Sequence, residues 1–166
     1  WNILERFFLP QKHKHKDSRN EGEKVTRVGG CCMLIKNQVF REIAFLDDRF
    51  FMYGEENDLC LRALLKGIDV IYYSKQEVVR KIKTDNNYLA FKGYYGARNS
   101  YYMIKKNFDG FKQAVLLTLY LLGEIKKLLS LCISGRFHAA RFLIKGIADA
   151  FKGRQGENPD LCHLRT

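Results

Sequence analysis

Apolar residues recur at helical spacing through much of this chain, and glycines interrupt the pattern where helices would end. Residues 68–73 are instead rich in β-branched and aromatic side chains, which predicts a strand. Residues 26–36, with a glycine pair before an apolar run, predict an approach to a strand. A short helical turn is predicted at residues 37–43, and longer helices at residues 59–66, 88–106, 111–133 and 136–151.

The last two predicted helices differ in polarity. The uniformly apolar run at residues 114–122 is far shorter than the roughly 20 residues of a membrane-spanning helix. The helix after it is amphipathic and basic, a pattern typical of binding to an anionic membrane surface. A helical hairpin packed on its own domain, or on a second subunit in a homo-oligomer, explains the pattern equally well. One face carries Phe137, Ala140, Ile144, Ile147 and Phe151, and another carries Arg141, Lys145 and Lys152.

Three carboxylates fall within four residues at Glu55, Glu56 and Asp58, directly after an aromatic run at residues 50–53. Crowded carboxylates repel one another, so at least one is expected to have a raised pKa, which suits a general base. The same residues also suit the first turn of a helix, where acidic side chains are favoured without any catalytic role.

Composition narrows the class of protein. The hydrophobic content of 46% is that of a globular protein with a core. A net charge of +11 implies attraction to polyanions, such as an anionic membrane or a diphosphate-bearing substrate. No nucleic-acid-binding motif accompanies the charge, so nucleic acid is not an expected partner. Five cysteines without a Cys-x-x-Cys pair, and no secretory pattern, favour the cytoplasm.

Three motifs occur in order at short spacing: the glycine pair followed by Cys-Cys-Met-Leu-Ile-Lys at residues 29–36, Phe-Leu-Asp-Asp-Arg-Phe-Phe at residues 45–51, and Glu-Glu-Asn-Asp-Leu-Cys-Leu-Arg at residues 55–62. Together they resemble the acceptor-side half of a family 2 glycosyltransferase, most similar to the rhamnosyltransferase type, over about residues 25–107. The resemblance implies an α/β fold. Residues 1–107 would form a partial GT-A (Rossmann-like) domain that lacks the N-terminal nucleotide-binding half. A helical extension would follow at 108–153 and a flexible tail at 154–166.

The resemblance also implies roles for individual residues. In an inverting sugar transfer, a base removes the proton of the acceptor hydroxyl as that oxygen attacks the anomeric carbon. Glu56 occupies the position of this base, and Glu55 would support it or contact the acceptor. Asp58 would cap the helix, and Arg62, one turn along, would pair with it as structural support. Three further residues are expected near the acceptor: Gly29, Gly30 and Asp48.

Two departures from the family pattern concern the donor side. The family's Asp-x-Asp metal motif is absent from this sequence, which begins at Trp1 and is expected to be a fragment. The resemblance implies a divalent metal ion, Mg²⁺ or Mn²⁺, in the intact enzyme, but this chain contains no ligand motif for that ion. Lys81 stands where many members have a histidine, and Arg80 or Lys81 is expected to contact the diphosphate.

The expected function is that of the acceptor-binding, catalytic-base half of an inverting glycosyltransferase. It would transfer a sugar from a nucleotide-sugar to a saccharide or lipid-linked acceptor in cell-surface polysaccharide synthesis. The intact enzyme would be cytoplasmic and peripheral on the inner face of the cell membrane, and this chain alone would be inactive. The alternative is a non-catalytic, truncated module that docks on a membrane or protein through its basic helices.

Overall fold

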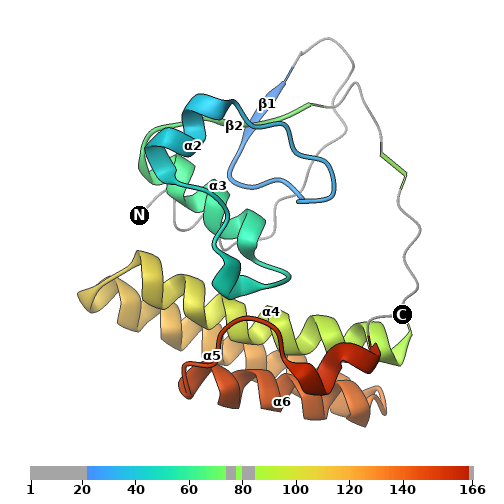
Figure 1. The fold of residues 1–166 in the computed structure, drawn as a ribbon. Helices are drawn as coiled ribbons and strands as arrows, with labels where there is room; N and C mark the ends of the chain where they lie inside the picture. Colours follow the sequence, from blue (N-terminus) through green and yellow to red (C-terminus); the bar gives the residue numbers. More distant parts are fainter. Residues whose placement is uncertain (1–21, 74–77, 80–84, 165–166) are drawn as a thin grey trace. The chain divides into compact units, whose positions relative to one another are not determined.

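The structure is a computed structural model that describes residues 22–73, 78–79 and 85–164, with side chains through Leu161. Its residues group into two compact units, each described here by itself. We call residues 1–46 with 55–81 the N-terminal unit, and residues 47–54 with 82–166 the helical unit. The elements (Figure 1) are β1 (Glu23–Val25), α2 (Asn37–Ile43), η1 (Asp48–Phe50), α3 (Glu55–Leu65), β2 (Val70–Tyr72), α4 (Asn86–Asn107), α5 (Gly110–Ile133), α6 (Phe137–Phe151) and η2 (Pro159–Leu164).

The N-terminal unit contains a two-stranded antiparallel sheet, α2 and α3. In the sheet, Glu23 of β1 lies opposite Tyr72 of β2, and Val25 lies opposite Val70. Leu59 and Ala63 of α3 lie one turn apart and pack into the same core. The core of the unit comprises Ile43, Leu59 and Ala63, with Met33, Ile35, Val39, Phe40, Ile68 and Val70 packed around it.

The predicted strand at residues 68–73 and the predicted helix at 37–43 are confirmed as β2 and α2. Residues 26–36, predicted to approach a strand, follow β1 without forming regular structure. Met33 and Ile35 are half-buried, whereas Leu34 between them is fully exposed. The side chains thus alternate as in a strand, but this segment pairs with no other strand in the described part of the chain. A two-stranded sheet does not define a GT-A domain, and the partial GT-A fold stays a prediction.

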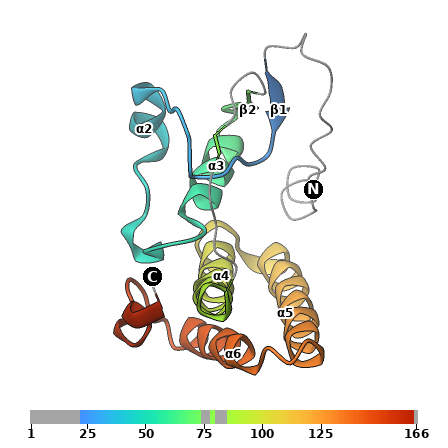
Figure 2. The same ribbon diagram turned by 90° about the vertical axis from the view of Figure 1, so that its right-hand side faces the viewer.

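In the helical unit, α4 packs against both α5 and α6 (Figure 2). The approach of α6 to α4 depends on Gly146, because a Cβ at this position would overlap the backbone of Tyr94, whose Cα would lie only 2.9 Å away. The Tyr94 hydroxyl donates a hydrogen bond to Asp149 of α6 at 2.8 Å. The Tyr120 hydroxyl of α5 donates to the Ala97 carbonyl at 3.1 Å. Helices are thus present where the sequence predicts them at 88–106, 111–133 and 136–151.

The buried face of α6 differs from the predicted apolar face. Phe137, Ile144 and Phe151 are each more than half exposed, whereas Ala140 of the predicted face is buried. Small residues face α4 instead, because two backbones that approach closely leave no room for large side chains. The buried residues of α6 are Ala139, Ala140, Leu143, Gly146, Asp149 and Ala150.

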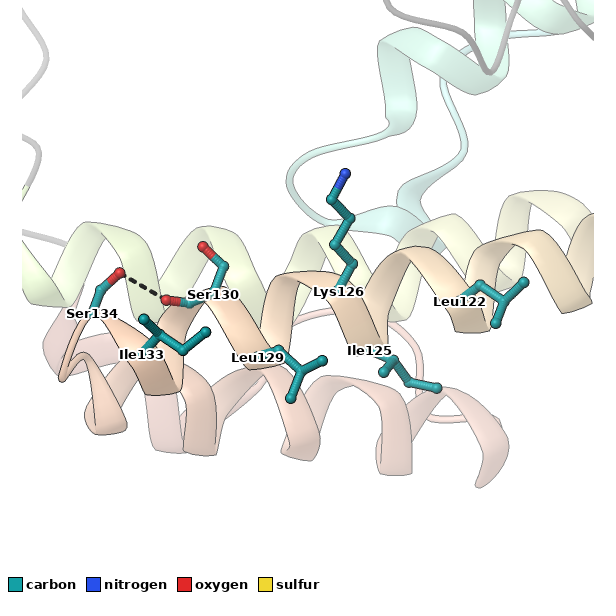
Figure 3. A pocket seen from close by; sticks show the side chains of 7 residues that line it. All are labelled: Leu122, Ile125, Lys126, Leu129, Ser130, Ile133 and Ser134. Carbon is teal, nitrogen blue, oxygen red and sulfur yellow. Dashed lines mark hydrogen bonds between the residues drawn. The ribbon is translucent and has the colours of Figure 1, made fainter.

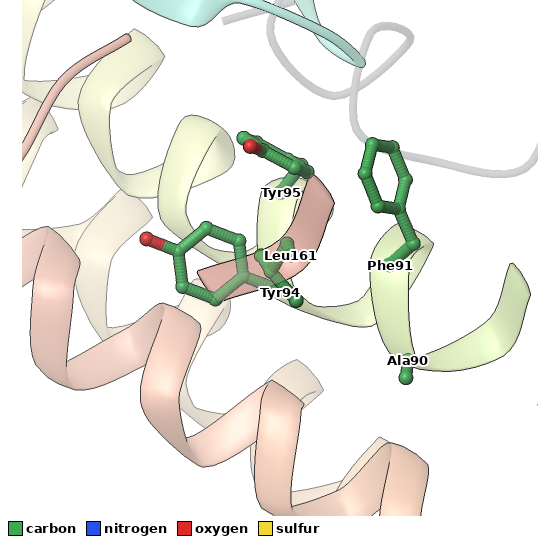
Figure 4. Packing of buried hydrophobic residues seen from close by; sticks show 5 residues of the cluster. All are labelled: Ala90, Phe91, Tyr94, Tyr95 and Leu161. Atoms are coloured by element: carbon green, nitrogen blue, oxygen red, sulfur yellow. The ribbon is translucent and has the colours of Figure 1, made fainter. Parts of the chain in front are cut away.

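The residues after α6 also differ from the expected flexible tail. Leu161 of η2 is fully buried beside Tyr94, Tyr95 and Phe91 of α4 (Figure 4). The Asn158 amide donates a hydrogen bond to the Tyr95 hydroxyl at 2.9 Å. This segment therefore contacts the core of the helical unit through Asn158 and Leu161. The predicted domain boundary at residue 107 falls at the end of α4, inside the same unit.

Candidate functional site

The three carboxylates of the acidic motif lie in the first turn of α3. Their negative charge is favourable there because the amide groups at a helix N-terminus carry partial positive charge. This location agrees with the interpretation that the acidic residues stabilise the first turn of a helix. It also places Glu55 and Glu56 at the end of α3 rather than in its middle.

Gly30 lies against the side chain of Glu56. A Cβ built on Gly30 would come within 3.3 Å of Glu56 Cβ and 3.8 Å of Glu56 Cδ. The absence of a side chain at Gly30 therefore lets its backbone lie close to Glu56, the residue that the sequence assigns as the base. Gly29 is exposed, and a Cβ there would meet only the Cys31 Sγ at 3.8 Å. The structure thus brings together two of the predicted site residues, Gly30 and Glu56.

Glu55 is half-buried, and its Oε2 atom is buried without a hydrogen-bond partner in the described part of the chain. Burial raises the pKa of the Glu55 carboxyl, and the charge and hydrogen bond of Glu56 raise it further. One raised pKa is what crowding of the carboxylates predicts, although the sequence does not say which residue carries it. A buried carboxylate oxygen without a partner is uncommon and marks Glu55 as a functional candidate beside Glu56.

The predicted ion pair between Asp58 and Arg62 is present. Asp58 is fully buried, and its Oδ2 accepts a hydrogen bond from Arg62 Nε at 2.8 Å. The Arg62 guanidinium also donates to the carbonyls of Ile43, of Ala44 at 3.3 Å and of Phe45 at 3.0 Å. Ala44 has a φ of 62°, which is rare for a residue with a side chain. The pair therefore fixes the strained segment after α2 to α3.

Asp48 lies in η1 and is exposed. It belongs to the helical unit, whereas the acidic motif belongs to the N-terminal unit. Its neighbour Asp47 forms the stronger contacts, with Arg49 Nε at 2.7 Å and Lys106 Nζ at 2.7 Å. These hydrogen bonds, above all those from Arg49, lower the pKa of Asp47 far below its ordinary value.

The loop between η1 and α3 has an unusual backbone. Phe51 and Tyr53 have φ values of 62° and 63°, and Gly54 has a φ of 104°. Left-handed conformations are costly for aromatic residues and persist only when surrounding contacts hold them. Glu55, the first residue of α3, follows directly after this loop in the chain.

Asn99 of α4 supplies the contacts that hold the loop. Its Nδ2 atom donates to the carbonyls of Phe50, Met52 and Tyr53 at 2.8, 2.8 and 2.7 Å. Asn99 is almost fully buried, so these bonds are shielded from water. Carbonyls that would otherwise lack helix or sheet partners are thereby satisfied by one side chain.

Arg98 supports the same loop from the next position. Its guanidinium donates to the Phe50 carbonyl at 3.1 Å, to the Gly156 carbonyl at 2.8 Å and to Asn99 Oδ1 at 3.0 Å. The sequence motifs described above assign no site role to Arg98 or Asn99. In the sequence, these two polar residues lie within a helix rich in aromatic side chains. This was the available signal, because polar side chains that become buried need hydrogen-bond partners.

Two donor-side expectations find no site in the described residues. Arg80 and Lys81, expected to contact the diphosphate, lie outside them. For the divalent metal ion, no group of three or more His, Cys, Asp or Glu side chains among residues 22–73, 78–79 and 85–161 is placed to hold one.

In the described ranges, no helix combines the length and the apolar character needed to cross a bilayer.

The sequence of this chain is similar to that of a curated transferase. Over 100 residues it is 31% identical to the low-salt glycan biosynthesis hexosyltransferase Agl10 of Haloferax volcanii. The match covers 55% of this chain and 32% of that protein, so the chain spans about a third of the length of this curated relative. No family model matches the chain, and no solved structure matches it. The chain is therefore a distant relative of a hexosyltransferase of glycan biosynthesis.

Proposed function

We propose that this chain is the acceptor-side part of an inverting glycosyltransferase of family 2 with a GT-A fold. The intact enzyme transfers a sugar from a nucleotide-sugar to a saccharide or lipid-linked acceptor in cell-surface polysaccharide synthesis. The observation that carries the proposal is the similarity to a hexosyltransferase of glycan biosynthesis. The close approach of Gly30 to Glu56 at the start of α3 supports it, because it brings together two of the residues that the motifs assign to the acceptor site.

In this proposal Glu56 is the general base. Its carboxylate removes the proton from the acceptor hydroxyl while that oxygen forms the new bond to the anomeric carbon and the nucleoside diphosphate leaves. Gly29 and Gly30 are proposed to border the acceptor. Glu55 is proposed to support the base or to contact the acceptor, and burial raises the pKa of its carboxyl.

The test is the variant Glu56→Gln in the whole protein that carries this sequence. Glutamine keeps the size of the side chain but cannot accept a proton, so kcat should fall by about 10²–10⁴-fold. Release of nucleoside diphosphate from a panel of nucleotide-sugars, with and without saccharide acceptors, measures the transfer. Glu42→Gln, an exposed substitution on α2, is the matched control and should leave kcat unchanged.

The pH profile separates the two carboxylates. If Glu56 is the base, Glu56→Gln removes the rise of kcat/KM with pH, and Glu55→Gln retains that rise. If the Glu56→Gln enzyme had the kcat of the wild type and the Glu55→Gln enzyme were inactive, Glu55 rather than Glu56 would be the general base. Absence of acceptor-dependent nucleoside diphosphate release by the wild type would overturn the proposed function itself.

A further inference from the structure

The outer face of α5 is apolar. Leu122, Ile125, Leu129 and Ile133 follow one another at intervals of three or four residues and are each more than half exposed. We call these four residues the α5 stripe. They project from the same side of the helix and line a shallow hollow together with Lys126, Ser130 and Ser134 (Figure 3). A helix on the surface of a globular protein ordinarily presents polar residues on this side.

The inner face of α5 is correspondingly less apolar than the outer one. Leu116, Tyr120 and Glu124 are its buried residues. Glu124, the one acidic residue of the helix, is buried, and its Oε1 accepts a hydrogen bond from Lys127 at 2.6 Å. The helix thus buries its carboxylate while the four apolar residues of the α5 stripe are exposed. Contiguous apolar surface of this kind indicates a partner that covers it.

The charges around the α5 stripe have one sign. Residues 110–154 contain only two acidic residues, Glu124 and Asp149, and both are buried. Asp149 accepts from Tyr94 and pairs with Arg154 at 3.3 Å. The exposed charges of α5, α6 and the turn between them are therefore cationic. Five exposed basic residues of this segment have no carboxylate partner in the described part of the chain: Lys112, Lys126, Arg136, Arg141 and Lys152.

We propose that the α5 stripe and these five basic residues dock the protein on the surface of a lipid bilayer that contains anionic head groups. The apolar side chains would enter the boundary between head groups and acyl chains, and the basic side chains would contact the phosphates. Charge complementarity favours this occupant over a second copy of the chain, because two copies joined through this face would bring cationic surfaces together. The inference goes beyond the proposed transferase activity and does not depend on it.

Sedimentation with vesicles tests the proposal on the 166-residue chain. The protein should pellet with vesicles of phosphatidylglycerol and phosphatidylcholine, and remain in the supernatant with phosphatidylcholine alone. Raising the salt concentration should weaken binding, because salt screens the attraction between basic residues and head groups.

Two sets of variants separate the apolar and the charged contributions. Ile125→Ser, Leu129→Ser and Ile133→Ser, combined in one protein, should weaken binding at least tenfold, since each removes apolar atoms from the membrane boundary. Lys126→Gln, Arg136→Gln and Arg141→Gln, also combined, should weaken it roughly a hundredfold at low salt, at about fivefold per charge. All six side chains are exposed, so the fold should persist, and circular dichroism checks that it does.

Matched controls come from exposed residues of the N-terminal unit. Leu34→Ser with Leu65→Ser and Val79→Ser removes equivalent apolar surface, and Lys36→Gln with Arg41→Gln and Lys66→Gln removes equivalent charge. Both control proteins should bind as the wild type does. Equal binding to neutral and anionic vesicles, no binding to either, or loss of binding in the controls to the same extent would overturn the proposal. So would a dimer, measured by light scattering, that the α5 stripe variant abolishes, since a second copy would then occupy the face.

Discussion

Asn99 satisfies three backbone carbonyls with a single amide nitrogen, and the conformation of residues 50–54 depends on it. The left-handed φ values of Phe51 and Tyr53 are stable only because these contacts outweigh the steric cost. Nothing in the hydrophobic pattern of α4 indicates where Asn99 points. A sequence shows that a polar residue lies within an aromatic helix face, but the partners that compensate its burial lie about 50 residues away and become visible only in the fold.

Asn99→Ala should lower the free energy of unfolding by about 2 kcal/mol, because it removes the Asn99 donor from the Phe50, Met52 and Tyr53 carbonyls. Urea unfolding of the 166-residue chain measures the change. Asn86→Ala, an exposed substitution at the start of the same helix, should stay within about 0.5 kcal/mol of the wild type. Equal effects of the two substitutions would contradict the role of Asn99 in holding the loop.

At the scale of elements, the sequence predicts where most helices lie but not which faces they bury. Phe137, Ile144 and Phe151 form an apolar face by spacing, yet α6 packs through Ala139, Gly146 and Ala150. Spacing identifies large apolar side chains, whereas close packing of two helices selects small ones. In the acidic motif, by contrast, the Asp58–Arg62 pair follows directly from its spacing of four residues, since such residues are neighbours on any helix.

Two glycines in helices should respond to alanine with opposite signs. Gly146→Ala should destabilise the protein by about 1–3 kcal/mol, because the new methyl group would overlap the Tyr94 backbone and push α6 from α4. Gly123→Ala, in open space on α5, should instead stabilise it by up to about 1 kcal/mol through helix propensity. Thermal unfolding of both variants measures the difference, and stabilisation by both would show that α6 does not pack as described.

At the scale of the whole molecule, the two units contain carboxylates whose pKa values shift in opposite directions. The pKa of Asp47, in the helical unit, is lowered by Arg49 and Lys106, so its contribution to stability is present above its ordinary pKa of 3.8 and is lost as pH falls below that value. The pKa of Glu55, in the N-terminal unit, is raised by burial. Its contribution is therefore complete below 4.5 and is lost as pH rises through the raised pKa.

Asp47→Asn should consequently weaken the acid sensitivity of the helical unit. Between pH 5 and pH 3 the wild type should lose about 1 kcal/mol more stability than the variant, because only in the wild type does the unfolded chain bind a proton at residue 47 that folding must release. Urea unfolding at the two pH values, followed by circular dichroism of the helices, measures this loss. Asp48→Asn, at the exposed neighbouring position, is the control, and an equal effect of both substitutions would exclude Asp47 as the cause.

The interleaving of the two units along the chain has a consequence for cutting the protein. Residues 47–54 belong to the helical unit, although residues on both sides of them belong to the N-terminal unit. A truncation after residue 81 would therefore remove Arg98 and Asn99 and leave Phe50, Met52 and Tyr53 without their hydrogen-bond donors. A fragment that starts at residue 82 would in turn retain Asn99 but lose the carbonyls it serves. No single cut or gene fusion point separates this chain into two self-sufficient pieces.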